Sequence, residues 1–414
     1  MAAFTHSDNT SLPETPFLGL APFLRMSIAN IDLLPISQDM LAKAHDSDDA
    51  NLWMNLSTVM LCLRQRDIGL AIQAQALEMK RVYHLAASEQ PAKLCLLMLM
   101  APGDLAANTP LDCLLENSDI DLDFYYVSPD ASLISPIPEH DALIVAMSES
   151  AENRGILASL EQTLAHWPKP VINAPQNIPA TERNTASMLL QNVPGLLIPP
   201  TLRVPRQTLL EVGFGNTRLH ELFEDCFFPV IVRPVGSQAG RDLDKIDGPE
   251  GMAAYLAKVD EAEFFLSRFI DYSGKDGLFR KFRVTMIDGV AFACHMAVSS
   301  NWMVHYVNAG MYEDERKRAE EVYFMEHFDD FAQQHRSALD AIYRRTKLDY
   351  FCIDCAETQG GQLLVFEVDH IMVVHAMDPE DLFPYKLPHM KNIQKAFRDF
   401  LFRLTSGRTS KMLA

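Results

Sequence analysis

The stretch LDYFCIDCAETQGGQLLVFEVDH, residues 348–370, contains two β-prone runs separated by a Gly-Gly pair. This pattern predicts an antiparallel β-hairpin. Side chains at i and i+2 of a strand share a face, so Glu367 and Asp369 point the same way, away from Phe366 and Val368. The pairing strand brings Asp354 near them. Three carboxylates on one face repel one another unless a cation lies between them. Oxygen ligands favour Mg²⁺, Mn²⁺ or Ca²⁺ over zinc, so the hairpin predicts a metal site.

Ordinary acidic residues on a solvated hairpin would give the same isolated pattern, but a second segment favours the metal site. Residues 227–242 read FFPVIVRPVGSQAGRD, a short apolar strand that leads into a loop of small residues, 236–240. Backbone N–H groups in such loops bind phosphate oxygens. The two segments together indicate a nucleotide and a divalent cation.

The order of these motifs resembles the ATP-grasp superfamily, which includes D-alanine:D-alanine ligase, glutathione synthetase and ribosomal-protein glutamate ligases. A basic residue on a strand, Arg233, precedes the small-residue loop, and Asp354 is followed thirteen residues later by Glu367-x-Asp369. The resemblance covers roughly residues 170–405 as an ordered series of short motifs. It implies ATP and Mg²⁺ or Mn²⁺ as cofactors, with Asp354, Glu367 and Asp369 as the metal ligands.

Several residues depart from the pattern of the superfamily. Most members have lysine where this chain has Arg233, and arginine keeps the charge while adding a fork suited to phosphate oxygens. The hinge segment EFFLSRFIDY lacks the usual glutamate, which leaves Asp271 as the candidate for ribose. Asp369 stands where asparagine is usual and still offers oxygen ligands. The nucleotide-binding residues implied by the resemblance are Arg203 or Arg206, Arg233, Gly236, Ser237, Gly240, Ser267, Arg268, Phe269, Ile270, Asp271 and Lys281.

The segment FRKFRVTMIDGVAFACHMAVS is predicted to form a second hairpin around Asp288-Gly289. The resemblance implies catalytic roles for Arg233, for Arg283, which would hold a substrate carboxylate or the γ-phosphate, and for His295. A lone histidine in an apolar strand is also common as a satisfied core residue. Residues 299–310, which include Trp302 and His305, are long enough to form a second lid over the site.

Composition limits the classes of partner. The 414-residue chain has 48% hydrophobic residues, enough for more than one compact core, and a net charge of −19 that opposes binding to nucleic acid or anionic membranes. No apolar run approaches the roughly 18 residues of a membrane-spanning helix, and the N-terminus lacks a signal-peptide pattern. We therefore expect a cytoplasmic protein. Its seven scattered cysteines indicate reduced core thiols, and an offset of three puts Cys352 and Cys355 on opposite faces of a strand.

The N-terminal part of the chain predicts two further units. Residues 1–35 suggest an extended leader, and a helical hairpin with an early Trp53 follows, which resembles a tetratricopeptide-like unit. Such a hairpin packs on a neighbouring domain or another subunit, and a docking role or a homo-oligomer is possible. Alternating strands and helices after residue 92 predict a parallel sheet. The expected organisation is an α/β and α+β multidomain fold: a helical segment (1–91), a small α/β domain (92–199) and an ATP-grasp core of two α+β subdomains (200–414).

The predicted function is an ATP-dependent ligase that joins a carboxylate to an amine or amino acid through an acyl phosphate. Two alternatives remain open at this point: a small-molecule kinase on the same scaffold, and a non-catalytic nucleotide-binding or docking protein. The sequence identifies neither the acid nor the amine. In the kinase a hydroxyl replaces the acid, whereas the missing lysine, the missing hinge glutamate and the tetratricopeptide-like hairpin suggest the non-catalytic protein.

Overall fold

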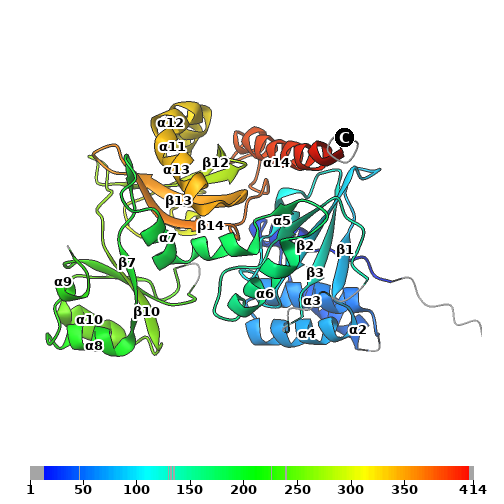
Figure 1. Cartoon of the computed structure of the whole chain (residues 1–414), viewed down its shortest axis with the longest axis horizontal. Coiled ribbons are helices and arrows are strands. Elements are labelled where there is room, and N and C mark those ends of the chain that lie inside the picture. Colours follow the sequence, from blue (N-terminus) through cyan, green and yellow to red (C-terminus); the bar gives the residue numbers. More distant parts are fainter. Residues whose placement is uncertain are drawn as a thin grey trace, which may run out of the picture.

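The computed structural model describes residues 14–409, with the exception of residues 46, 129, 131, 132, 134, 135, 225, 238 and 239. Three sheets organise this part of the chain (Figure 1). Their strand orders are β1-β3-β2-β4-β5, β7-β10-β8-β9 and β12-β11-β13-β14-β6. The predicted α/β and α+β multidomain class is confirmed.

Four helices precede the first sheet and share its core. Asp49 begins the third by accepting hydrogen bonds from the backbone N–H groups of Asn51 and Leu52 at 3.0 and 3.2 Å, as expected of an N-cap. Met54 and Ala76 are buried in the same cluster as the strands of the sheet. The helical hairpin is therefore confirmed as a packed element. The helices are α1 (Ala21–Ile28), α2 (Leu34–Ala44), α3 (Ala50–Cys62) and α4 (Arg66–Met79).

The first sheet has the predicted parallel core. β2 pairs in parallel with β3 and β4, and β4 pairs with β5, whereas β1 adds an antiparallel edge. β2 and β4 are almost wholly apolar and buried, as the strands of a covered parallel sheet are. The elements are β1 (Val82–Leu85), β2 (Leu94–Met100), α5 (Leu111–Leu114), β3 (Ile120–Tyr126), β4 (Ala142–Val145), α6 (Arg154–Leu164) and β5 (Val171–Ile172).

The second sheet is antiparallel and has a small core of its own. Its buried cluster includes Val232 and Phe264 and is separate from the main core. Two helices pack against each other beside it, α8 and α10. The chain enters through η1 (Pro175–Thr181), α7 (Arg183–Leu189) and β6 (Leu196–Leu197). The unit itself comprises β7 (Thr201–Pro205), α8 (Arg206–Gly213), α9 (Leu219–Leu222), β8 (Val230–Pro234), β9 (Asp244–Ile246), α10 (Pro249–Leu256) and β10 (Glu263–Arg268).

The third sheet holds both predicted hairpins. Asp288 and Gly289 have φ of 49° and 78°, the two positive values of the predicted tight turn. The charged run after residue 312 forms a helix, as predicted, and α14 extends from this sheet towards the first (Figure 1). The elements are β11 (Phe279–Ile287), β12 (Val290–Ser299), η2 (Tyr306–Asn308), α11 (Glu315–Glu326), α12 (Phe328–Gln334), α13 (Arg336–Thr346), β13 (Tyr350–Glu357), β14 (Leu363–Asp369) and α14 (Lys386–Thr409).

Three N-terminal predictions need comment. The extended leader is wrong where the structure describes it, because α1 and the start of α2 lie within residues 14–35, and residues 1–13 lie outside the described part. The tetratricopeptide-like character stays a prediction, as do the domain boundaries. Strands beside both boundaries pair across them: β1 with β3, and β6 with β14. Within the described residues, no helix combines the length and apolar character needed to cross a bilayer.

A buried asparagine ties the first sheet to the third. Asn173 follows β5, has φ of 51° and is fully buried. Its Nδ2 donates to the Tyr350 carbonyl at 2.7 Å, and its Oδ1 accepts from the backbone N–H groups of Asp349 and Tyr350 at 2.9 and 3.0 Å. These bonds fix the start of β13, and hence the position of the acidic hairpin.

We predict that Asn173→Ala lowers the free energy of unfolding by about 3 kcal/mol, because buried backbone groups lose their partners. Urea denaturation measures the change. Asn192→Ala is the matched control, since Asn192 has a similar φ of 59° but is exposed. Equal losses in the two variants would mean that backbone strain, and not the hydrogen bonds, accounts for the effect.

Candidate active site

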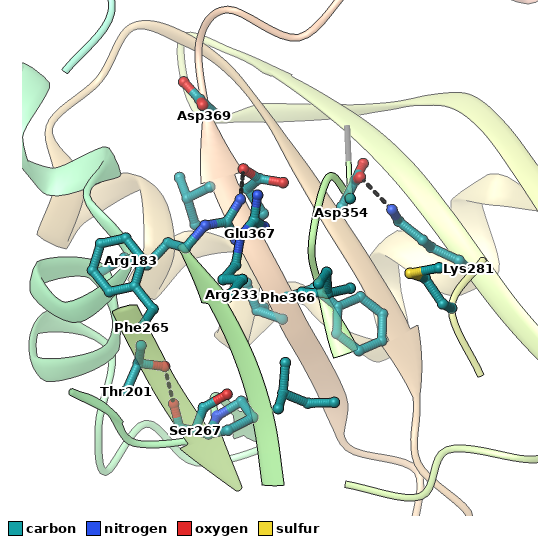
Figure 2. A pocket seen from close by; sticks show the side chains of 18 of the residues that line it. Arg183, Thr201, Arg233, Phe265, Ser267, Lys281, Asp354, Phe366, Glu367 and Asp369 are labelled. Carbon is teal, nitrogen blue, oxygen red and sulfur yellow. Dashed lines mark hydrogen bonds and ion pairs between the residues drawn. The ribbon is translucent and has the colours of Figure 1, made fainter. Parts of the chain in front are cut away.

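A cavity of about 500 Å³ lies between the second and third sheets. Figure 2 shows side chains from β8, β10 and α7 meeting those of β11, β13 and β14. Most residues implied by the sequence line this cavity, although they are spread over 137 positions from 233 to 369, both ends included. They are Arg233, Gly240, Ser267, Arg268, Phe269, Ile270, Lys281, Arg283, Asp354, Glu367 and Asp369.

The β13–β14 hairpin departs from simple alternation at one point. Asp354 pairs with Glu367, but the next residue of β13, Cys355, pairs with Val365, so Phe366 is an extra residue in a β-bulge. A bulge re-aims side chains and is common beside functional sites. Phe366 consequently lines the cavity together with Glu367, and the prediction that it points away is wrong. Its ring lies 4.9 Å from that of Tyr272, between centroids.

Asp354 is neutralised by protein cations. Its carboxylate, 3% exposed, lies 2.7 Å from Lys281 Nζ and accepts from Arg283 Nε at 2.8 Å and from the terminal Nη2 of the same guanidinium at 3.1 Å. Burial opposes its ionisation, but Arg283 and Lys281 outweigh burial and hold the pKa of Asp354 well below its usual value. Asp354 therefore needs no further cation in this arrangement.

Glu367 and Asp369 form a pair of acids that is less well compensated. Glu367 has an ion pair with Arg183. Burial, together with the nearby charge of Glu367, raises the pKa of Asp369 to about 7. Mg²⁺ is commonly bound by one or two carboxylates plus substrate phosphates. This pair fits such an ion, whereas no group of three or more Asp, Glu, His or Cys side chains among the described residues forms a ready metal cage.

Arg233 faces the acid pair from the other side of the cavity (Figure 2). It is 8% exposed, donates from Nε to Ser237 Oγ at 3.2 Å and also donates to the Ser237 carbonyl. Among the described residues it has no ion pair with a carboxylate, and burial together with Arg183 lowers its pKa to about 9. Glu367 attracts this guanidinium but is itself paired with Arg183, so the buried cation is incompletely compensated and its position favours an anionic ligand.

Arg206 and Asp271 lie outside the cavity and are used elsewhere in the fold. Arg206 donates to the carbonyls of Leu256 and Val259 and closes the C-terminal end of α10. Asp271 is exposed and accepts a local hydrogen bond from the Ser273 N–H at 2.9 Å. Neither lines the cavity, so their predicted contacts with phosphate and ribose are not supported by the geometry.

His295 lies beside a cavity residue but outside the cavity. It pairs with Arg283 across β11 and β12, yet it is not among the residues that line the cavity. Its ring packs against that of Tyr306, 5.0 Å away between centroids. Burial and the neighbouring Arg283 lower its pKa well below the usual value, so it is neutral. The core-histidine alternative fits His295 better than a catalytic role.

Arg203 belongs to a second cavity of about 690 Å³ that adjoins the first. The two cavities share Arg183, Glu367 and Asp369. The second cavity is bordered by the loops that follow β2 and β4. These loops lie at the carboxyl edge of the parallel strands, where ligands bind in open α/β sheets. Gly236 and Ser237 also line it.

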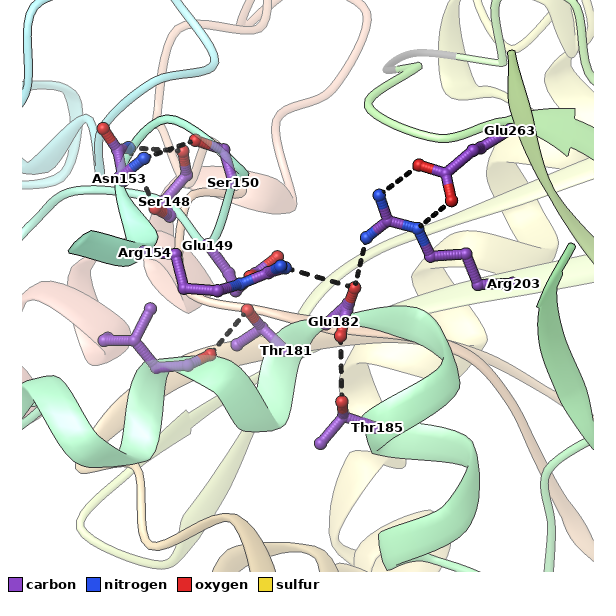
Figure 3. Close-up of polar contacts among 11 residues, drawn as sticks. Ser148, Glu149, Ser150, Asn153, Arg154, Thr181, Glu182, Thr185, Arg203 and Glu263 are labelled. Atoms are coloured by element: carbon purple, nitrogen blue, oxygen red, sulfur yellow. Dashed lines mark hydrogen bonds and ion pairs between the residues drawn. The ribbon is translucent and has the colours of Figure 1, made fainter. Parts of the chain in front are cut away.

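A chain of charges runs along this second cavity (Figure 3). Arg154 is paired with Glu149 at 2.6 Å and with Glu182 at 3.4 Å, and Arg203 lies 3.5 Å from Glu182. Arg203 is also paired with Glu263. The chain links α6 of the first sheet to β7 and β10 of the second, so it connects the two walls of the cavity.

Sequence reasoning missed Arg183 as a site residue. It is the first residue of α7, it lines both cavities, and it binds Glu367. The basic residue sits far from the other motifs in sequence, and only the packing of α7 beside β14 brings it there. Phe265 and Tyr272 were missed as well, since nothing marks an apolar residue of a strand as a cavity residue.

No family model and no curated protein matches the chain. Several solved structures align with it. D-alanine–D-alanine ligase from Bacillus anthracis complexed with ATP aligns at 13% identity over 78% of this chain and 100% of that chain, with a TM-score of 0.47. VanG D-Ala:D-Ser ligase from Enterococcus faecalis aligns at 13% identity over 76% and 99%, with a TM-score of 0.46.

An ATP-grasp RimK domain protein from Sphaerobacter thermophilus aligns at 13% identity over 74% of this chain and 99% of that chain, with a TM-score of 0.41. Because all three TM-scores lie below 0.5, we base the functional assignment on the geometry of the cavity.

The raised pKa of Asp369 gives a prediction for pH. Between pH 4 and 7 the folded protein keeps this proton while the unfolded chain has lost it, so stability falls as pH rises. Asp369→Asn removes this loss and should be more stable than the wild type at pH 8 by up to about 4 kcal/mol, and by little at pH 4. Urea denaturation at both pH values measures the difference.

Mg²⁺ should raise the stability of the wild type at pH 8 more than that of Asp369→Asn, because it binds the folded acid pair. Asp381→Asn, which changes an exposed acid outside the cavity, is the control. An Asp369→Asn advantage that does not depend on pH would contradict the assigned pKa.

Proposed function

We propose that this protein is an ATP-dependent ligase that joins a carboxylate to an amine. The observation that carries the proposal is a buried arginine, Arg233, without a carboxylate partner among the described residues, opposite the acid pair Glu367 and Asp369. A polyanion that brings its own divalent cation satisfies both sides at once. A nucleoside triphosphate is such a ligand.

The cavity offers separate places for the parts of ATP. Aromatic and apolar side chains gather at one end, where Phe269 lies 5.8 Å from Trp302 between ring centroids and Phe366 packs on Tyr272. We assign this end to the adenine, with the backbone of the 267–270 segment beside it. The triphosphate then extends towards Arg233, Arg183 and Lys281.

In this proposal an oxygen of the substrate carboxylate attacks the γ-phosphorus of ATP. The bond from that phosphorus to the β–γ bridging oxygen breaks, and ADP leaves with the electron pair. The amine then attacks the acyl carbon, inorganic phosphate leaves, and the amine proton passes to solvent as the amide forms. The chain's own residues orient the reactants and stabilise the charge on the transferring group, and no protein nucleophile is needed.

A divalent cation, Mg²⁺ or Mn²⁺, belongs to this proposal. Glu367 and Asp369 would hold it, and Asp354, kept ionised by Lys281 and Arg283, borders the same cavity. The ion would neutralise phosphate charge and polarise the γ-phosphoryl group. Glu367 has to exchange Arg183 for the ion, which would free that guanidinium for a phosphate.

The second cavity is our proposed place for the acid and the amine. It opens at the acid pair through the residues shared with the first cavity, and small molecules in it would meet the γ-phosphate end of the nucleotide. Its charges of both signs fit substrates that carry charged groups.

The direct test is phosphate release from ATP with Mg²⁺ across a panel of carboxylic acids, each with and without amines. A ligase releases phosphate only with the right acid and forms an amide when the amine is present. A phosphorylated alcohol formed without any dependence on amine would identify the kinase alternative. ATP binding without turnover on any acid or alcohol would identify a binding protein.

Arg233→Met should weaken ATP binding at least tenfold, because charge-assisted hydrogen bonds to phosphate are lost. The fold should keep or gain stability, since a buried cation is removed. Calorimetric titration and thermal unfolding measure the two effects. Arg344→Met, at an exposed position on α13, is the matched control. Unchanged ATP affinity in Arg233→Met would remove the observation on which the proposal rests.

A further inference from the structure

His305 contributes a polar group to the cavity that the proposed function has not yet used. It lies in the segment between β12 and α11 and lines the cavity, where the charges of Lys281 and Arg233 act on its ring. A Cβ added to Gly240 would lie only 2.5 Å from His305 Nε2, so the imidazole lies directly against this glycine. Gly240 has φ of 72° and belongs to the loop that follows β8.

The segment that carries His305 is anchored on both sides. Val304 and Ala309 are 3% and 2% exposed and belong to one apolar cluster. Tyr306 donates to Glu321 at 2.8 Å, and Lys386 Nζ lies 3.9 Å from the centre of the Tyr306 ring. Val307, at the tip of this segment, is 91% exposed. These contacts fix the backbone beside His305, so the imidazole is placed by the fold.

Local structure also sets the charge of the ring. His305 precedes η2, where its backbone carbonyl accepts from the Asn308 N–H at 3.0 Å and its backbone N–H donates to Asn308 Oδ1 at 2.9 Å. These bonds use backbone atoms of His305 and leave the imidazole to the cavity. A neutral imidazole carries one N–H, so the ring can donate one hydrogen bond. Burial and the charge of Lys281 lower the pKa of His305, which keeps the ring neutral.

We infer that His305 is a binding residue for the transferring phosphoryl group, to which it donates a hydrogen bond from Nε2. The inference rests on the proposed function. Its basis is the cavity: the imidazole lines the same space as Arg233 and Lys281, and its Nε2 lies against Gly240 of the loop after β8. Donors aimed in advance at a developing charge stabilise it without reorganisation.

The decisive experiment uses two substitutions that divide the functions of the ring. His305→Asn keeps an acceptor in the place of Nδ1 and is itself a favourable N-cap, so it should fold, but it loses the Nε2 donor. His305→Gln places an amide N–H near the position of Nε2. Val307→Ala is the control, because Val307 is in the same segment and is 91% exposed.

We expect His305→Asn to bind ATP with Mg²⁺ about tenfold more weakly than the wild type and ADP equally well, by calorimetric titration. Its kcat for phosphate release should fall about 100-fold, and His305→Gln should recover most of both losses. Equal losses of ATP and ADP affinity, or a His305→Gln variant no better than His305→Asn, would overturn the inference.

The same titrations separate the inference from the proposed function. A wild type that prefers ATP to ADP through His305 but releases no phosphate with any acid supports the inference and contradicts the ligase assignment. A wild type that forms an amide while His305→Asn matches it in ATP affinity and kcat supports the ligase and contradicts the inference. A wild type that binds no ATP contradicts both.

Discussion

The placement of the site depends on the hydrogen bonds that hold the β13–β14 hairpin. β11 pairs with β13 on one side, β6 pairs with β14 on the other, and Asn173 binds the backbone where β13 begins. The acids of the hairpin are therefore placed by backbone pairing and by one buried amide. Their mutual repulsion is reduced by Lys281 and Arg283 at Asp354, by Arg183 at Glu367, and by the proton that Asp369 retains to about pH 7.

Charge compensation divides the acids into two kinds. Asp354 lies opposite Arg283 in the pairing of β13 with β11, so its counter-ion comes with the register of the sheet. Glu367 and Asp369 are on β14, which is not adjacent to β11, and the cation paired with Glu367 is Arg183, which comes from a helix in another part of the chain. This difference explains why one acid is ionised without a ligand and why Asp369 retains a proton to about pH 7. A cation that arrives with a ligand would act on the second kind.

The two walls of the cavity belong to sheets with separate cores. The sheet that carries Arg233 has its own small cluster, whereas the strands that carry the acids contribute their apolar residues to the main core. No residue of the small cluster belongs to the main core among the described residues. Such an interface permits the walls to move relative to each other when a ligand enters.

The sequence alone determined the local features: both hairpins, the parallel strands, the strand–loop unit around Arg233 and the acidic pattern of β14. Each depends on periodicity or on turn residues within a few positions of one another. Only the tertiary structure decided which charges meet. It assigned Arg206 to the end of a helix, turned Asp271 to solvent, brought Arg183 to Glu367 and placed Phe366 in the cavity through a bulge. A side chain's partner from another segment is set by packing over the whole chain, which no short pattern encodes.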